Sequence, residues 1–306
     1  MPGSLRGARY LRRGSEWLAR FIVDTMPALD LYETLDFYVE LERANLPPSD
    51  LALLACNDRF FLLTGLCNRV DAIHPWLFAR CREVEADPDN RLDLWSRGHY
   101  KSSIITFAGT IQDVLIDPEM TVGIFSFSKY TAKKFLIQIM QEFESNERLK
   151  TCFPDVLWWE PRKEAPRWSQ DDGIVLKRNG NPKEATIEAH GLVEGQPTGV
   201  HFKMLVFDDM IETRNITNPE QIQKATDAWE LSDNLGVGPG TIRRYIGTRY
   251  LIGDTYETMI NRKVVKPRIY PATHNGREDG RPVFWDQKTW DEKRISQRGS
   301  LAAQLL

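Results

Sequence analysis

Short apolar strands alternate with helical segments after residue 90, and this alternation constrains the fold more than any other feature of the sequence. Strands are favoured over Arg91–Trp95 and Val122–Phe127, and helical spacing follows each of them, over Ser102–Leu115 and Tyr130–Glu144. Further strands are expected over Met204–Phe207 and Thr241–Gly247. Asn179-Gly180, between two apolar runs, predicts a hairpin turn. The rhythm predicts an α/β domain with a mainly parallel central sheet flanked by helices.

Two flanking regions differ from this core in their pattern. From Asp30 to about Arg82, apolar residues recur at helical spacing with a break at Pro47-Pro48, which predicts a helical leader. After Arg262 the chain becomes basic and carries prolines, and a last helical pattern runs from about Thr289 to Leu306. We therefore expect a helical N-terminal region over 1–85, a core over 86–262, and a lid or linker segment over 263–306.

Composition argues against several classes of protein. The 306 residues carry a formal net charge of −3, so any contact with nucleic acid must be local rather than spread over a basic surface. The four cysteines form no CxxC pair, which argues against a zinc site and a disulfide framework. No apolar run is long enough for a signal peptide or a membrane span. We expect a soluble intracellular protein that does not bind a membrane.

The segment between the first strand and its helix has the residues of a phosphate-binding loop. Such a loop needs inward-facing backbone N–H groups, a helix N-terminus, a lysine for the β- and γ-phosphates and a hydroxyl for Mg²⁺. Lys101 supplies the charge and Ser102 the hydroxyl. Tyr100 replaces the usual glycine, so by itself the segment also fits a strand-to-helix turn with a solvated lysine. The candidate nucleotide-binding residues are Arg97, Gly98, His99, Tyr100, Lys101, Ser102 and Ser103.

Two later strands end in residues that an NTPase needs near such a loop. Met204–Phe207 is followed by Asp208-Asp209; one carboxylate of such a pair can bind Mg²⁺ while the other orients the attacking water. The strand that ends at Gly247 is followed by Thr248, whose hydroxyl can sense a γ-phosphate. Each feature alone also fits a strand that ends in a polar loop. Their combination and their order favour a nucleotide-hydrolysing site.

In this combination the chain resembles the large terminase subunit of tailed bacteriophages. The phosphate loop of that family often reads Arg-Gly-x-x-Lys-Ser/Thr, as do Arg97, Gly98, Lys101 and Ser102. The resemblance covers roughly residues 90 to 306 and is weak over the helical leader. Further matching segments are Ser128–Ala132, Leu149–Pro154, Thr186–Gly191, Thr198-Gly199 and Gly247–Tyr250.

The resemblance implies a role for each motif residue. Lys101 and Ser102 would hold the phosphates and Mg²⁺, and Arg97 would contact phosphate or follow the nucleotide state. Asp208 would serve the metal. Thr248 would couple hydrolysis to movement.

Two positions depart from the family's pattern. Asp209 stands where many members carry the glutamate that positions water; aspartate is shorter by one C–C bond, about 1.5 Å, so either the loop lies closer or Glu212 assists. Val200 stands where members often carry the arginine that a neighbouring subunit inserts into the site. Arg178 and Arg214 are alternatives for that arginine, and each also fits a surface position.

The resemblance also implies a fold, a reaction and partners. The fold is a P-loop NTPase of the additional-strand (ASCE) type, and the reaction is Mg²⁺-dependent hydrolysis of ATP that drives double-stranded DNA into a viral shell. By the same resemblance the subunits would form a ring, usually a pentamer, on the portal protein, fed by the small terminase subunit in the cytoplasm of the infected bacterium. An isolated chain can be monomeric. The family's C-terminal nuclease domain, and with it nuclease activity, is expected to be absent here.

Alternatives to a packaging motor are a helicase-like translocase, a metal-dependent nuclease and a nucleotide-binding assembly module that does not hydrolyse. A nuclease would use Asp208, Asp209 and Asp254 as a two-metal cluster. Asp254 with Glu257, however, also has the spacing of a capped helix N-terminus. The residues that can contact DNA phosphates, or instead form a solvated or inter-subunit surface, are Arg243, Arg244, Arg249, Lys263, Lys266 and Arg268.

Overall fold

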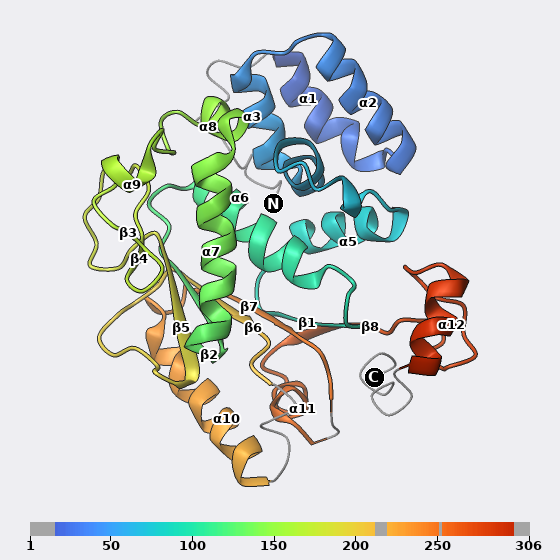
Figure 1. Ribbon diagram of the computed structural model, residues 1–306, viewed down its shortest axis with the longest axis vertical. Helices are drawn as coiled ribbons and strands as arrows, with labels where there is room; N and C mark the ends of the chain where they lie inside the picture. Colours follow the sequence, from blue (N-terminus) through green and yellow to red (C-terminus); the bar gives the residue numbers. More distant parts are fainter. Residues whose placement is uncertain (1–15, 212–218, 251–252, 297–306) are drawn as a thin grey trace.

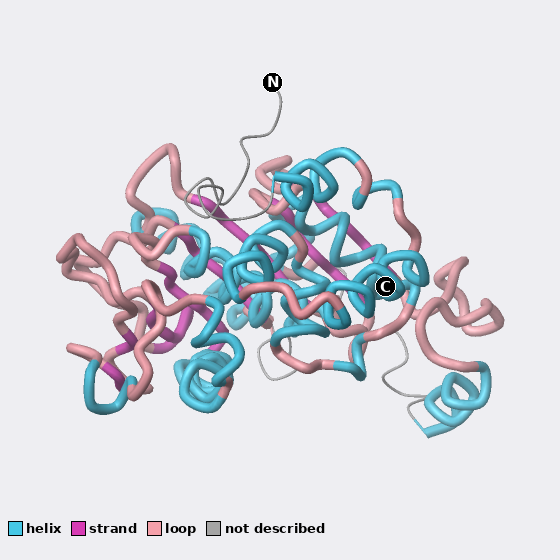
Figure 2. The backbone as a smooth tube through the Cα atoms, turned by 90° about the horizontal axis from the view of Figure 1, so that it is seen from above, coloured by secondary structure: helices cyan, strands magenta, loops and turns pink. Residues whose placement is uncertain are grey.

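A single mostly parallel sheet forms the centre of the molecule. The computed structural model describes residues 16–211, 219–250 and 253–296. Within them, eight strands form one sheet in the order β3-β4-β5-β2-β6-β7-β1-β8. Helices flank this sheet, and the helices that precede β1 gather at one end of the molecule (Figures 1 and 2). The α/β class predicted from the alternating pattern is therefore confirmed.

The strands that carry the predicted motifs are all parallel. The pairs β5·β2, β2·β6, β6·β7, β7·β1 and β1·β8 are parallel, whereas β3 and β4 are antiparallel at one edge. β7 lies between β1 and β6. The strands are β1 (Arg91–Trp95), β2 (Val122–Ser128), β3 (Trp168–Ser169), β4 (Gly173–Ile174), β5 (Ile187–Glu194), β6 (Met204–Asp208), β7 (Ile242–Gly247) and β8 (Lys266–Tyr270).

The leader is helical, as its apolar spacing predicts. The Asp30 side chain caps the second helix by accepting the Glu33 N–H at 2.9 Å, and Glu33 accepts the Asp30 N–H at 3.0 Å, which completes a capping box. The predicted break at Pro47-Pro48 separates α2 from α3. The segments are α1 (Glu16–Asp24), η1 (Met26–Ala28), α2 (Leu31–Arg43), α3 (Pro48–Asn57), α4 (Arg59–Phe61), η2 (Leu62–Leu66), η3 (Val70–Ala72) and α5 (Pro75–Ala86).

Helices also connect the parallel strands, including those predicted over Ser102–Leu115 and Tyr130–Glu144. The first of them contains a π-helical stretch, η4, which the sequence did not predict. The last helix ends at Ser296, and the remainder of its predicted range lies outside the described residues. The segments are η4 (Ser103–Ala108), α6 (Gly109–Ile116), α7 (Lys129–Ser145), α8 (Glu147–Cys152), α9 (Pro161–Glu164), α10 (Pro219–Ser232), η6 (Asp233–Leu235), α11 (Thr255–Asn261) and α12 (Gln287–Ser296).

The sheet has a hydrophobic core on each face, because successive side chains of a strand point to opposite faces. Val206 and Ile246 belong to one core, which continues without a break into leader residues such as Phe60. Phe207 and Tyr245 belong to the other, which includes residues of α10 and α11. The leader and the sheet therefore share a core across the expected boundary at residue 85.

The tight hairpin predicted at Asn179-Gly180 is wrong. β4 and β5 do pair antiparallel, through Ile174 and Ile187, but residues 175–186 connect them instead of a two-residue turn. The Glu119 carboxylate accepts the Asn179 N–H at 2.7 Å and the Gly180 N–H at 3.0 Å. A tertiary contact therefore holds the dipeptide, in place of the local strand pairing that its sequence suggested.

Two of the arginines considered for contact with DNA phosphates are buried in ion pairs. Arg268 of β8 donates to both carboxylate oxygens of Asp93 in β1, at 2.8 and 2.7 Å. Arg244 of β7 donates to Asp113 of α6 at 2.5 Å. Arg244 is 2% exposed and Arg268 is 7% exposed, so neither can contact DNA from these positions. β8 itself comes from the segment 263–306 and forms the edge of the sheet next to β1.

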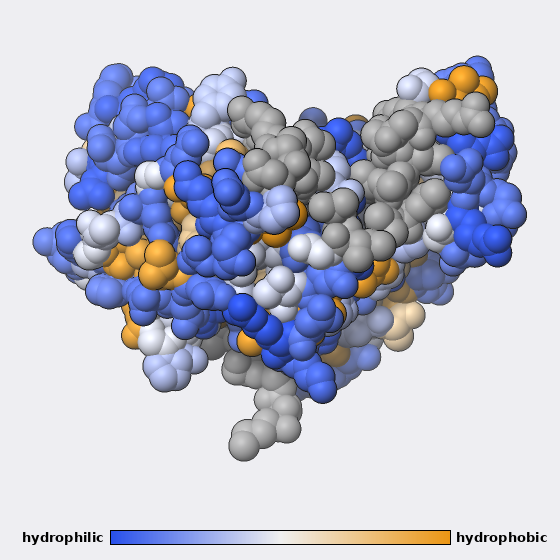
Figure 3. All heavy atoms as spheres, turned by 90° about the horizontal axis from the view of Figure 1, so that it is seen from below, coloured by the Kyte–Doolittle hydropathy of each residue, from blue (hydrophilic) through white to orange (hydrophobic). Residues whose placement is uncertain are grey.

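The surface carries its apolar residues in separate places. Figure 3 shows a face that is largely hydrophilic, with hydrophobic residues in small patches. Exposed large apolar residues such as Tyr32, Tyr130 and Ile295 come from different helices, as is usual for a protein surface. In the part of the chain that is described, no helix combines the length and the apolar character needed to cross a membrane.

Candidate functional site

The three predicted motifs lie at one edge of the sheet. β1, β7 and β6 are parallel neighbours in that order, so their carboxyl ends meet at the same edge. The loop that contains Lys101 follows β1, Asp208 ends β6, and Thr248 follows β7. This is the edge at which open α/β sheets bind ligands.

Two hydrogen bonds connect the motifs directly. Lys101 Nζ donates to Thr248 Oγ1 at 2.8 Å, and Ser102 Oγ donates to Asp208 Oδ1 at 3.1 Å. Lys101 is 7% exposed, so the alternative of a strand-to-helix turn with a solvated lysine is wrong. Ser103, the last candidate of the loop, begins η4 and is half-buried. Residues more than a hundred positions apart in the sequence thus form one constellation.

The loop backbone shows how tyrosine can replace glycine. Gly98 has a φ of 78° and Tyr100 a φ of 62°, both in the left-handed region. This conformation costs a non-glycine residue about 1–2 kcal/mol. The Tyr100 hydroxyl donates to Asp71 at 2.6 Å, and the Tyr100 ring meets Phe284 edge-on at a centroid distance of 5.7 Å. These contacts offset the conformational cost and attach the loop to the leader and to the segment before α12.

The His99 side chain packs into an aromatic cluster. Its ring lies 4.4 Å from Trp285, 5.4 Å from Trp76 and 5.4 Å from Phe284, measured between centroids. Burial lowers the pKa of His99 to about 4, so the ring is neutral near pH 7. The His99 backbone N–H donates to the Ser96 carbonyl at 3.3 Å. His99 therefore anchors the loop and brings no positive charge to a phosphate.

Arg97 is exposed and turns toward the segment after β7. Its Nη2 donates to the Tyr250 hydroxyl at 2.9 Å, and its guanidinium carbon lies 5.7 Å from the centroid of the Tyr250 ring. Tyr250 follows Thr248 by two residues, so both cations of the loop, Lys101 and Arg97, contact the same short segment.

Asp208 is a buried carboxylate beside a second acid. Burial, and next the charge of Asp209, raise the pKa of Asp208 to about 7, while hydrogen bonds from Thr106 and Ser102 and the charge of Lys101 act against this rise. Thr106 donates to the second carboxylate oxygen of Asp208. Hydroxyl and carboxylate oxygens are ligands that Mg²⁺ accepts, and Mg²⁺ usually adds water and phosphate oxygens to one or two carboxylates. The donor set at Ser102 and Asp208 fits such an ion.

The backbone around Asp209 is fixed by both neighbouring strands. Asp209 has a φ of 51°, a left-handed conformation that aspartate adopts more readily than most residues. Its N–H donates to the Ile246 carbonyl at 2.9 Å, and its carbonyl accepts the Phe127 N–H at 3.3 Å. Burial first, and next the charge of Asp209, raise the pKa values of Asp208 and Tyr256. Its carboxylate is therefore close to both groups.

The N-cap predicted at Asp254 is confirmed. The Asp254 side chain accepts the Glu257 N–H at 3.0 Å at the start of α11. The Glu257 carboxylate accepts the Gly253 N–H at 2.5 Å and a hydrogen bond from Arg249 at 2.9 Å. Tyr256 of the same helix lies against Gly247, at the end of β7. α11 is thus fixed to the end of β7 and to Arg249, which follows that strand.

Asp254 gives a testable dependence of stability on pH. Burial raises its pKa to about 6, from about 3.9 in an unfolded chain. The folded state therefore holds the proton more tightly, and stability present below about pH 4 is lost as the pH rises through about 6. Asn caps a helix as well as Asp does but does not ionise. Between about pH 4 and 7, the free energy of unfolding should fall on the order of 3 kcal/mol further in the parent than in Asp254→Asn. Denaturant titrations measure this difference, and parallel pH profiles would contradict it.

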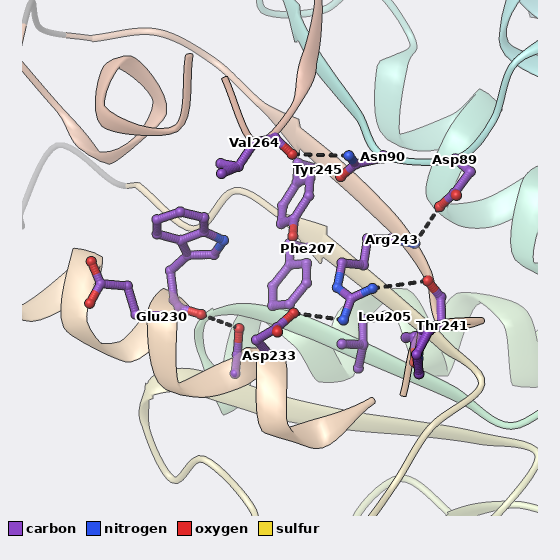
Figure 4. A pocket seen from close by; sticks show the side chains of 13 residues that line it. Asp89, Asn90, Leu205, Phe207, Glu230, Asp233, Thr241, Arg243, Tyr245 and Val264 are labelled. Atoms are coloured by element: carbon purple, nitrogen blue, oxygen red, sulfur yellow. Dashed lines mark hydrogen bonds and ion pairs between the residues drawn. The ribbon is translucent and has the colours of Figure 1, made fainter. Parts of the chain in front are cut away.

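The cavity in Figure 4 is distinct from this site. It has a volume of about 550 Å³ and lies between α10 and the face of β6 and β7 that carries Phe207 and Tyr245. These two rings stack at a centroid distance of 4.9 Å, and Arg243 pairs with Asp233 at 2.6 Å beside them. The loop that carries Lys101 leaves the sheet at the end of β1, whereas Arg243 lies near the start of β7.

The structure places one of the two arginines considered for insertion into a neighbouring site. Arg178 donates to the carbonyls of Glu184 at 2.9 Å and Pro182 at 3.3 Å, in the loop before β5. That loop lies at the amino edge of the parallel strands, opposite the edge that carries Lys101. Arg214, like Glu212, lies outside the described residues.

The chain matches no protein-family model, and the comparison with curated proteins finds no similar sequence. The resemblance to large terminases therefore rests on the motifs themselves. Two residues of the site were given no role from the sequence: Thr106 was not named, and Tyr250 was named only as the end of the matching segment Gly247–Tyr250. Thr106 follows Ser102 by four positions, so helical spacing already placed it on the same face. For Tyr250 the matching segment was the only signal, because a residue that follows the end of a strand shows no periodic pattern.

Proposed function

We propose that the chain is the ATP-hydrolysing motor domain of a viral DNA-packaging terminase. The observation that best supports ATPase activity is the contact between the motifs: Lys101 binds Thr248, and Ser102 binds Asp208. The position of β7 between β1 and β6 supports a P-loop NTPase of the additional-strand type, because that class separates the loop strand from the acidic strand by one strand. What hydrolysis drives is proposed from the family resemblance of the motifs.

The proposed roles follow from charge and position. Lys101, with Arg97, neutralises the β- and γ-phosphates of ATP, and the backbone from Gly98 supplies N–H groups. Ser102 and Asp208 would hold Mg²⁺, which supplies positive charge to the phosphoryl group in the transition state. Asp209 orients the attacking water and accepts its proton. Thr248 links the loop lysine to β7.

The proposal includes the setting of a packaging motor. Subunits would form a homomeric ring, a pentamer, on the portal protein in the cytoplasm of the infected bacterium. The small terminase subunit would deliver double-stranded DNA to the ring. Asp254 bears on the nuclease alternative: its carboxylate caps α11 through the Glu257 N–H, a role in the fold that needs no metal.

Asp209→Asn tests the hydrolytic role. Asparagine has the same shape but accepts no proton, so single-turnover cleavage of ATP should slow about 100-fold or more. Binding of ATP should remain within a few-fold of the parent. Asp227→Asn, at an exposed position of α10, is the matched control and should cleave at the parent rate. Equal rates for Asp209→Asn and the parent would remove Asp209 from the chemistry, and a parent that binds but never cleaves ATP would favour a non-hydrolysing assembly module.

A further inference from the structure

Both cations of the phosphate loop are held by the segment 248–250. Lys101 donates to the Thr248 hydroxyl at 2.8 Å, and Arg97 donates to the Tyr250 hydroxyl at 2.9 Å while its guanidinium lies over the Tyr250 ring. In the described part of the chain, no carboxylate forms an ion pair with Arg97. Its partner is therefore a neutral phenol rather than an anion.

We propose that Tyr250 is a positioning residue that holds Arg97 in the nucleotide-free site and gives it up to the γ-phosphate of ATP. The proposal rests on the function proposed above. A guanidinium binds phosphate through charge-assisted hydrogen bonds that are about twice as strong as those to neutral groups. The γ-phosphate therefore competes successfully with Tyr250 for Arg97.

The same competition acts on Lys101 and Thr248, two residues earlier in the segment. When both cations turn to the phosphates, the segment loses both of its contacts with the loop together. β7 is held between β1 and β6, so the strand itself stays in place and the change falls on the residues that follow it. Those residues lead to α11, to which Arg249 is tied through Glu257 at 2.9 Å. α11 thereby responds to whether a γ-phosphate is bound at the loop.

Equilibrium binding of a non-hydrolysable ATP analogue and of ADP tests the proposal. Tyr250→Phe keeps the ring and removes the competing hydroxyl, so the analogue should bind about fivefold more tightly, equivalent to about 1 kcal/mol. ADP lacks the γ-phosphate, and its affinity should not change. In an Arg97→Ala background the effect of Tyr250→Phe on the analogue should vanish. Tyr32→Phe, exposed on α2 of the leader, is the matched control and should bind both nucleotides like the parent.

The outcomes separate this inference from the proposed function. A parent that binds neither nucleotide would overturn the proposed function. A parent that binds both, with unchanged affinities in Tyr250→Phe, would overturn the role of Tyr250 and leave the ATPase standing. An effect of Tyr250→Phe that persists without Arg97, or that is equal for ADP, would show that Tyr250 acts on packing alone and would also overturn it.

Discussion

Replacing Lys101 by alanine is expected to lower the rate of ATP hydrolysis by about 100-fold or more, because it removes a preorganised positive charge from the phosphoryl group in the transition state. Lys101 is 7% exposed, and its ammonium group donates to Thr248 at the carboxyl edge of the sheet. Phosphate release at saturating ATP measures the effect. Lys224→Ala, exposed on α10, provides the control and should keep the parent rate.

The Lys101→Ala result also separates the candidate activities. A motor, whether it packages DNA or acts as a helicase-like translocase, depends on this lysine for turnover. A nuclease built on Asp208 and Asp209 would keep cleaving DNA without it. Turnover of ATP within about threefold of the parent would therefore contradict the ATPase, provided that thermal unfolding shows the variant to be folded.

Gly247→Ala is expected to destabilise the protein by about 3 kcal/mol, through overpacking at the end of β7. A Cβ at Gly247 would lie 2.2 Å from the Tyr256 hydroxyl oxygen and 2.4 Å from the ring carbon that carries it. Tyr256 is fully buried, so its ring cannot move aside without disturbing the core. Denaturant unfolding measures the loss of stability.

A matched glycine and a second-site change make this prediction specific. Gly240 has open space where its Cβ would stand, so Gly240→Ala should change stability by less than about 1 kcal/mol. In a Tyr256→Leu background, Gly247→Ala should cost clearly less than in the parent, because contacting residues are not additive. Equal costs in both backgrounds would show that the ring does not set the limit.

The sequence predicted the strands and helices whose apolar residues follow a regular pattern. Met204–Phe207 and Val122–Phe127 are apolar runs that are buried on both faces, a pattern that parallel strands share. β8 was not expected, because Pro267 and Arg268 are unusual in a strand. A proline is tolerated at a sheet edge, and Arg268 is buried only because Asp93 of β1 pairs with it. Such a partner lies far away in the sequence and leaves no periodic signal.

Residue type and order predicted the residues of the candidate site. They did not predict the contacts that hold those residues in place. Lys101, Ser102, Asp208 and Thr248 follow from what phosphate and Mg²⁺ require. The left-handed backbone of Tyr100 could not be foreseen, since it depends on contacts from other elements that offset its cost. Likewise, whether an arginine faces solvent, an acid or a phenol depends on the three-dimensional fold.

The pairing of β8 with β1 has a practical consequence for anyone who divides this chain. A fragment cut to residues 86–262 would leave Asp93 without Arg268 and would open the hydrogen-bonding groups of β1 to solvent. An open strand of this kind recruits other copies, and an uncompensated buried carboxylate weakens the remainder. A fragment that keeps this fold must therefore be longer than the site alone requires: it has to include Arg268 and the leader residues, from Leu18 onward, that share the core of the sheet.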